Sequence, residues 1–203
     1  MSGRIWATGS NVLSRTAVAP GGMGSSRLSN LEPYEIAILA RELSCLEPDY
    51  DLVLVDLAAG ISPANLRWMK PAHDRILVTN PEVTALIEAY GLVKCLALEG
   101  GEAIREINVV MNRVRDEAEF HQSMKKLRQV VAKHLSNVRL NSLGYIPFDR
   151  YLLHSIAIQR PAVLSPQGLC DFLSAWHRGQ VVRSLSGLGE TPVPRCGNPF
   201  LFC

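Results

Sequence analysis

The sequence lacks the features that mark several classes of protein. No apolar run reaches the roughly 18 residues that a membrane-spanning helix needs, and no apolar segment follows Arg4 as it would in a secretory signal. The five cysteines include no C-x-x-C pair, which argues against a zinc site or a disulfide framework and favours a reducing environment. A net charge of +2 gives no general attraction to nucleic acid. We therefore expect a globular, cytoplasmic protein.

Lysine is also absent from residues 1–69, and the first lysine of the chain is Lys70. This absence matters for residues 18–27 (VAPGGMGSSR), whose glycines resemble a phosphate-binding loop. A Walker A motif, G-x-x-x-x-G-K-[ST], needs a lysine that reaches the phosphates, and its helix begins at that lysine. Here the next predicted helix begins only near Pro33. We therefore interpret Gly21–Gly24 as a turn after a short strand, Thr16–Ala19.

Apolar runs alternate with amphipathic segments along most of the chain. Continuous apolar runs predict buried strands, and apolar residues three or four positions apart predict helices. Alternation at this interval is typical of βαβ units in a doubly wound α/β fold with a mostly parallel sheet. Beyond Ala19, the predicted strands cover 52–55, 75–79, 107–112 and 140–147, and the predicted helices cover 33–47, 63–69, 81–99, 117–135 and 165–184. We expect one domain over residues 16–184, with residues 1–15 and 185–203 disordered.

Asp56 follows the apolar run Leu52–Val55 and would lie at the sheet edge where α/β proteins bind ligands. Four apolar residues before a carboxylate match a Walker B pattern, in which the carboxylate holds Mg²⁺ directly or through water. An aspartate at this position would equally serve to cap the next turn, and the residues alone do not decide between the two roles. Gly60, four residues later, allows close approach of the backbone to a phosphate.

Four segments carry a family resemblance: YDLVLVDLAAGIS (50–62), ILVTNPEVTALIEAYGLVK (76–94), INVVMNRV (107–114) and GYIPFDR (144–150). In this order and spacing they resemble the MinD/ParA family of deviant-Walker P-loop ATPases, and most of all its FlhG (FleN) branch. The match runs in register from Val18 to Val182. Its most specific parts are D-x-A-A-G-I and the helix P-E-x-T-x-x-x-x-A-Y-x-L-x-K.

The resemblance implies a site for ATP or ADP with Mg²⁺. Asp56 would be the Walker B carboxylate that holds Mg²⁺ through water, and Gly60 would sense the γ-phosphate. Asn112 would read the adenine edge, for which an amide offers a donor and an acceptor together. Arg113 and the turn at Pro147 and Phe148 would line the base and the ribose. Without the resemblance, we would interpret Asn112 as a turn residue at a strand end, and Pro147 and Phe148 as residues that pack in a turn.

The resemblance also implies that the chain corresponds to the C-terminal two-thirds of the family domain. The glycine stretch aligns with a later strand of the family, so the first strand, the Walker A loop with its lysines and the following helix have no counterpart here. The family's first strand lies beside the Walker B strand, and we therefore expect Leu52–Val55 to have an unpaired apolar edge. We assign no catalytic residue, and we expect no ATP hydrolysis by this chain alone.

The function that the resemblance implies is spatial regulation of flagellar assembly or of cell division. It further implies a nucleotide-dependent homodimer, flagellar assembly or division-site partners, and weak peripheral association with the inner face of the membrane, with no specific nucleic acid. Two alternatives stay open. One is a non-catalytic interaction protein that docks on a full-length relative or a flagellar partner. The other is a ParA-type DNA-partitioning protein, which salt-sensitive DNA binding would reveal.

Overall fold

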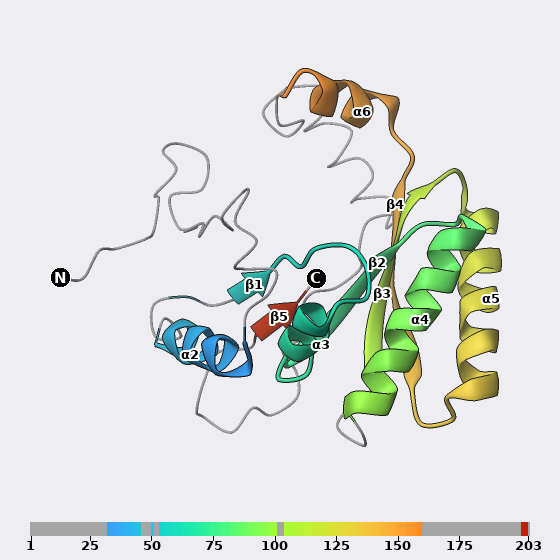
Figure 1. Ribbon diagram of the computed structural model, residues 1–203. Helices are drawn as coiled ribbons and strands as arrows, with labels where there is room; N and C mark the ends of the chain where they lie inside the picture. Colours follow the sequence, from blue (N-terminus) through green and yellow to red (C-terminus); the bar gives the residue numbers. More distant parts are fainter. Residues whose placement is uncertain (1–31, 46–49, 51–52, 101–103, 160–199, 203) are drawn as a thin grey trace.

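The computed structural model describes residues 32–45, 50, 53–100, 104–159 and 200–202 (Figure 1). Its helices are α2 (Pro33–Ser44), α3 (Pro63–Met69), α4 (Val83–Gly100), α5 (Glu117–His134) and α6 (Arg150–Ala157), and its strands are β1 (Val53–Val55), β2 (Asp74–Thr79), β3 (Glu106–Val114), β4 (Arg139–Pro147) and β5 (Phe200–Phe202). The predictions for 1–15, Thr16–Ala19, Gly21–Gly24 and 165–184 lie outside the described residues. No helix in the described ranges is both long enough and apolar enough to cross a bilayer.

The strands form one sheet in the order β1-β5-β2-β3-β4, and every pair of neighbours is parallel. Helix α4 connects β2 to β3, and helix α5 connects β3 to β4, so both connections are βαβ crossovers. Each predicted strand and helix from residue 33 to residue 147 has a counterpart within a few residues. The predicted fold class, an α/β protein with a mostly parallel sheet, is confirmed.

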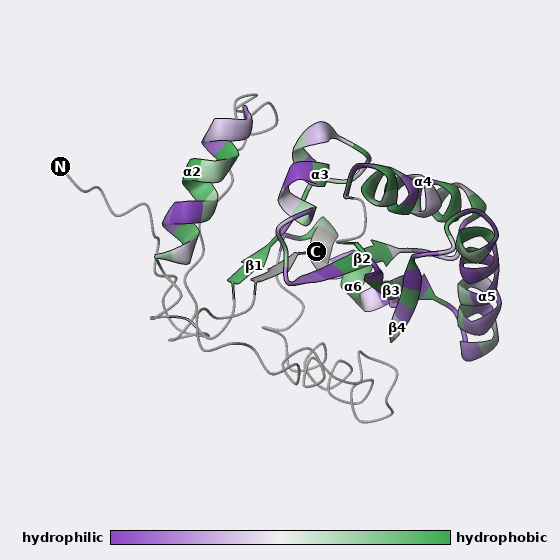
Figure 2. Cartoon of the chain, turned by 90° about the horizontal axis from the view of Figure 1, so that it is seen from below, coloured by the Kyte–Doolittle hydropathy of each residue, from purple (hydrophilic) through white to green (hydrophobic). Residues whose placement is uncertain are grey.

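The hydrophobic core lies between the sheet and helices α4 and α5, which lie side by side on one face (Figure 2). Both helices bury the apolar stripe that the sequence predicts, because residues three and four apart fall on one helix face. The strands contribute alternate residues to the same core. The least exposed side chains of this core are Val93, Leu96, Ile104, Ile107, Val109, Met111, Val114, Leu127 and Val131.

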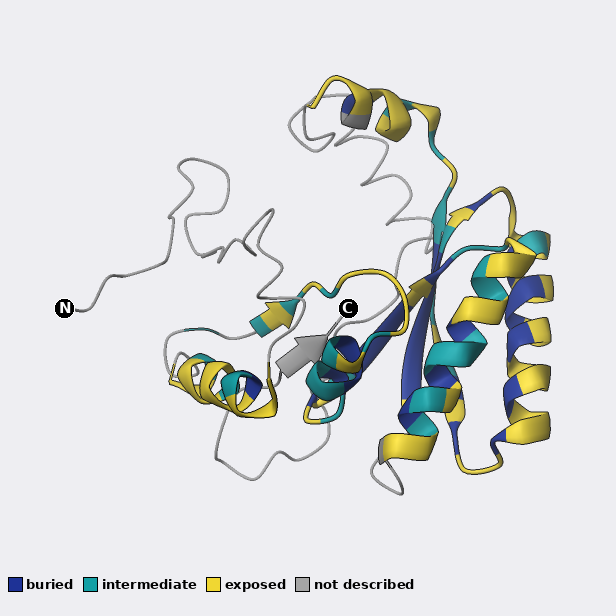
Figure 3. Cartoon of the chain, in the orientation of Figure 1, coloured by how far each residue is buried: buried dark blue, intermediate teal, exposed yellow. Residues whose placement is uncertain are grey.

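The opposite face of the sheet is only partly covered (Figure 3). Ile76 and Val110 are buried there with Leu143 packed against them, whereas Leu54 is 58% exposed and Val78 is 49% exposed. A continuous apolar run predicts burial on both faces, and this prediction is wrong for Leu54 and Val78 in the described part of the chain. Burial depends on what covers a strand, and the apolar run does not contain that information.

Strand β5 lies between β1 and β2, where both of its backbone edges are paired. Val53 to Val55 pair with Phe200 to Phe202, and β5 also pairs with β2 at Asp74 and Arg75. The structure therefore differs from the predicted irregular tail at these three residues. It also differs from the predicted unpaired edge, because the C-terminal strand occupies the place beside β1.

Glu106 at the start of β3 is held by side chains from β4. The guanidinium of Arg139 and the amide of Asn141 both donate to its carboxylate, with an Asn141 Nδ2 to Glu106 Oε2 distance of 3.1 Å. The hydrogen bond from Arg139 is the main cause that lowers the pKa of Glu106 below its usual range, and the bond from Asn141 adds to it. These contacts fix the register between the first residues of the two strands.

Protonation of Glu106 is expected to weaken the fold in acid. Because the folded-state pKa is lowered, the stabilisation is complete above the unfolded-state pKa of about 4.3 and is lost as pH falls through the folded value. The side chain is 49% exposed, so we expect an effect below about 1 kcal/mol. Urea unfolding should show Glu106→Gln less stable than the wild type at neutral pH and equal to it in strong acid. A constant difference at every pH would contradict this account.

Candidate functional site

All the predicted site residues lie in or just after the C-terminal parts of strands β1, β3 and β4. Parallel strands have their carboxyl ends on the same side, which is where open α/β sheets bind ligands. Asp56 directly follows β1, Asn112 and Arg113 are the two residues before the last residue of β3, and Phe148 follows the last residue of β4. The six residues fall into two groups, one beside β1 and one at the ends of β3 and β4.

The first group joins the ends of β3 and β4. Val114 is paired with Pro147, and the backbone N–H of Phe148 donates to the carbonyl of Val114 over 2.8 Å. The ring of Phe148 is 42% exposed. The Pro147–Phe148 turn therefore lies against the end of β3, and it presents a partly exposed aromatic ring of the kind that can stack on a base.

Asn112 has a local role in the structure. Its Oδ1 accepts the backbone N–H of Arg113 over 2.9 Å, and Arg113 adopts a left-handed backbone with φ 58°. The hydrogen bond supports this uncommon conformation, as expected for an asparagine at a strand end. The amide oxygen is thus already hydrogen-bonded, and an adenine would have to share that acceptor or displace the N–H.

The second group is the segment from Asp56 to Gly60. Asp56 is exposed, and Gly60 has φ 93°, a conformation that favours glycine. A Cβ added to Gly60 would meet no atom within 4 Å, so the space beside it is open. Within the described residues, no three His, Cys, Asp or Glu side chains gather as a metal cluster. A single exposed carboxylate fits Mg²⁺ only where phosphates and water supply the other ligands.

The two groups are not in contact. Strands β5 and β2 separate β1 from β3, so the groups are three strand spacings apart. At about 4.8 Å per spacing, this is about 14 Å across the sheet. The register adds a further offset along the strands, because Val55 is level with Phe202 and Arg75, and the next residue of β2, Ile76, pairs with Asn108, four residues before Asn112. An elongated ligand that reaches both groups must therefore cross the ends of β5 and β2.

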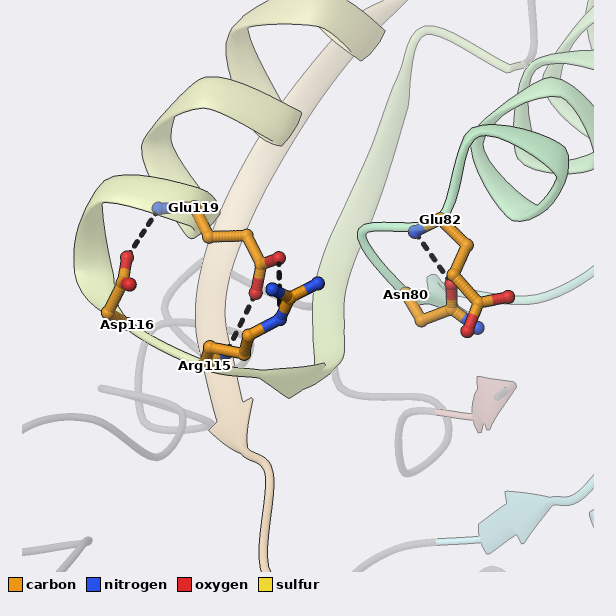
Figure 4. Close-up of polar contacts among 5 residues, drawn as sticks. All are labelled: Asn80, Glu82, Arg115, Asp116 and Glu119. Carbon is orange, nitrogen blue, oxygen red and sulfur yellow. Dashed lines mark hydrogen bonds and ion pairs between the residues drawn. The ribbon is translucent and has the colours of Figure 1, made fainter.

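Sequence reasoning missed the residues that order the loops after β2 and β3 (Figure 4). After β2, Asn80 Oδ1 accepts the backbone N–H of Glu82 over 2.9 Å. After β3, Asp116 caps α5 by accepting the N–H of Glu119 over 2.8 Å, and Glu119 accepts the N–H of Arg115 over 2.8 Å. The capping pattern D-x-x-E could have been found in the sequence. These contacts hold the starts of α4 and α5 at the candidate site.

The comparisons with known proteins agree with this arrangement. No protein-family model matches the chain. The chain is similar to the antiactivator FleN of Pseudomonas aeruginosa, with 28% identity over 70% of this chain and 50% of FleN. It is also similar to the chloroplastic septum site-determining protein MinD homolog of Arabidopsis thaliana, at 30% identity over 63% of this chain and 38% of that protein. The Synechocystis MinD is 27% identical over 59% of this chain and 42% of its own length. The chain is therefore similar to FleN and MinD proteins over 59–70% of its length.

These similarities confirm the resemblance to the MinD/ParA family that was identified from the four sequence segments. The chain spans half the length of FleN and less than half of the two MinD proteins. The strand order β1-β5-β2-β3 determines the order in which Asp56, the β2–α4 segment and Asn112 follow one another across the sheet. These similarities do not show what the chain binds, and a proposal about its ligand has to rest on the geometry of the strand ends.

Proposed function

We propose that this protein is a MinD-like spatial regulator that binds an adenine nucleotide with Mg²⁺ and acts on flagellar number or placement. Asp56 holds Mg²⁺ through water, and Gly60 lies beside the phosphates. Asn112, Arg113, Pro147 and Phe148 take the adenosine end. The chain does not hydrolyse ATP alone, because its sequence contains no Walker A lysine to stabilise charge on the transferred phosphoryl group.

The observation that carries this proposal is the shared edge of the parallel sheet. Asp56 and Asn112 lie at the carboxyl ends of β1 and β3, and this edge is the usual ligand site of open α/β sheets. The chemistry of the group beside β1 suits the phosphates of a nucleotide, and that of the group at the ends of β3 and β4 suits its base. The group beside β1 offers an exposed carboxylate and a glycine with open space beside it. The group at the ends of β3 and β4 offers an amide, a guanidinium and an exposed ring.

An exposed apolar strip beside the Asp56–Gly60 segment supports the proposal of a homodimer. Ile61 Cδ1 lies 2.9 Å from the position that a Cβ on Gly91 would take, so Ile61 packs against α4. One and two turns before Gly91, Ile87 is 63% exposed and Val83 is 69% exposed. Exposed apolar side chains that adjoin one another favour a protein partner. The proposed partner is a second copy that meets this edge.

Nucleotide binding without turnover is the expected behaviour of the purified chain. Titration calorimetry should detect Mg-ADP binding, and Asp56→Ala should weaken it at least about tenfold, or about 1.4 kcal/mol, because the metal loses its carboxylate. Glu88→Ala, which removes an exposed carboxylate on α4, is the matched control and should bind like the wild type. Release of phosphate from ATP that Asp56→Ala abolishes would contradict the proposed lack of hydrolysis. A wild-type chain that binds no adenine nucleotide would contradict the proposal itself.

A further inference from the structure

The segment Leu57–Ile61, between β1 and α3, is tied to the fold by one buried side chain. Asn65, the third residue of α3, is 7% exposed. Its Nδ2 donates to the carbonyl of Ala58 over 2.7 Å and to the carbonyl of Gly60 over 2.8 Å. A primary amide has two donor hydrogens, and these two contacts use both of them.

We infer that Asn65 is a positioning residue for the nucleotide site, an inference that rests on the proposed function. It acts through the peptide groups of the segment. A trans peptide is planar, with its N–H directed opposite to its C=O. The carbonyls of Ala58 and Gly60 are directed at Asn65, so the N–H groups of Ala59 and Ile61 are directed away from it. Both of these residues are exposed.

The two N–H groups suit the phosphate oxygens of a nucleotide. Backbone donors that are fixed before binding lose little freedom when an anion arrives, and several N–H groups together favour negative charge. Asp56 directly precedes the segment, so a phosphate bound to these donors would lie near the proposed Mg²⁺ ligand. Without the Asn65 amide, the carbonyls of Ala58 and Gly60 lose their donors and the two peptides are free to turn.

Helix α3 is itself held firmly, which is why it can position the segment. Leu66, the middle residue of the helix, and Met69, its last residue, are both buried in the core. At its C-terminal end, the buried guanidinium of Arg75 donates to the carbonyls of Met69 and Lys70, each over 2.7 Å. At its N-terminal end, the Ser62 hydroxyl accepts the backbone N–H of Asn65 over 3.1 Å. The cap and the carbonyl contacts are therefore separate interactions of the same residue.

The test separates these two interactions in the full 203-residue chain. Asn65→Leu removes both donors in a side chain of similar size, and Asn65→Asp keeps the shape but replaces the donors with acceptors. Ser62→Ala is the matched control, since it weakens α3 by about 1 kcal/mol through loss of the cap and leaves the Nδ2 contacts in place. Titration with Mg-ATP, which carries the γ-phosphate, measures binding, and hydrogen exchange at the amides of Ala59 and Ile61 measures the order of the segment.

We expect both Asn65 variants to bind Mg-ATP at least about tenfold more weakly and to exchange the Ala59 and Ile61 amides faster than the wild type. Ser62→Ala should melt at a lower temperature and still bind within about twofold of the wild type. A folded Asn65→Leu or Asn65→Asp protein with wild-type affinity would overturn the inference, even if it melts earlier. If the wild type binds no nucleotide, the proposed function fails, and unchanged amide exchange in the variants would then show separately that Asn65 does not order the segment.

Discussion

Replacement of Leu96 by alanine is expected to lower the free energy of unfolding by about 2–5 kcal/mol. Leu96 lies near the end of α4 and is completely buried in the core between the helices and the sheet. Truncation removes apolar contacts and leaves a cavity that close-packed neighbours fill only in part. Urea unfolding followed by far-UV circular dichroism measures the loss. A domain of this kind is stable by about 5–15 kcal/mol, so the change consumes a large fraction of the total.

Leu98, two residues later on the same helix, provides the control. Its side chain is 71% exposed, so Leu98→Ala removes the same atoms from α4 without opening a cavity. We expect it to change the free energy of unfolding by less than about 0.5 kcal/mol. Equal losses for the two variants would mean that the buried face of α4 is not the one that the structure describes.

The same helix shows what the sequence alone could predict. The spacing of Ala89, Val93 and Leu96 marks one buried face, and all three are in the core. Local periodicity is sufficient to predict this buried face, because an amphipathic helix that packs on a sheet turns its apolar stripe toward the sheet. The apolar residues Val83 and Ile87 at the start of α4 follow no such rule, and only the structure shows that both are exposed.

The candidate site was only partly predictable, for a different reason. Asp56 and Asn112 were predicted as site residues because each is a polar residue that follows an apolar run, and the carboxyl ends of parallel strands are where such sheets bind ligands. The separation of the two groups depends on the strand order, which no local pattern encodes. The hydrogen bonds from Asn65 to the carbonyls of Ala58 and Gly60 also depend on how α3 turns back over the segment, and their donor is an ordinary helix residue in the sequence.

Strand β5 is the element that the local sequence pattern predicts least well. Three residues, Phe200–Phe202, are too few to show a period, and their pairing partners are more than a hundred residues away. Yet β5 sits between β1 and β2, so both of these strands depend on it for one of their neighbours. Because Asp56 directly follows β1, the place of the proposed Mg²⁺ ligand depends on this short strand as well.

Leu201→Pro is therefore expected to destabilise the sheet by about 3 kcal/mol or more, because proline has no N–H to donate and is excluded from central strands. Leu201→Ala keeps the N–H and is the control for loss of the side chain. In the proline variant, the amides of Val53 to Val55 should exchange faster, since β1 pairs with no other strand in the described part of the chain. The exposed edges of β1 and β2 should also promote association, which size-exclusion chromatography detects. If the proline and alanine variants match in stability and exchange, β5 does not pair with β1 in solution, and the position of Asp56 has to be supported by other contacts.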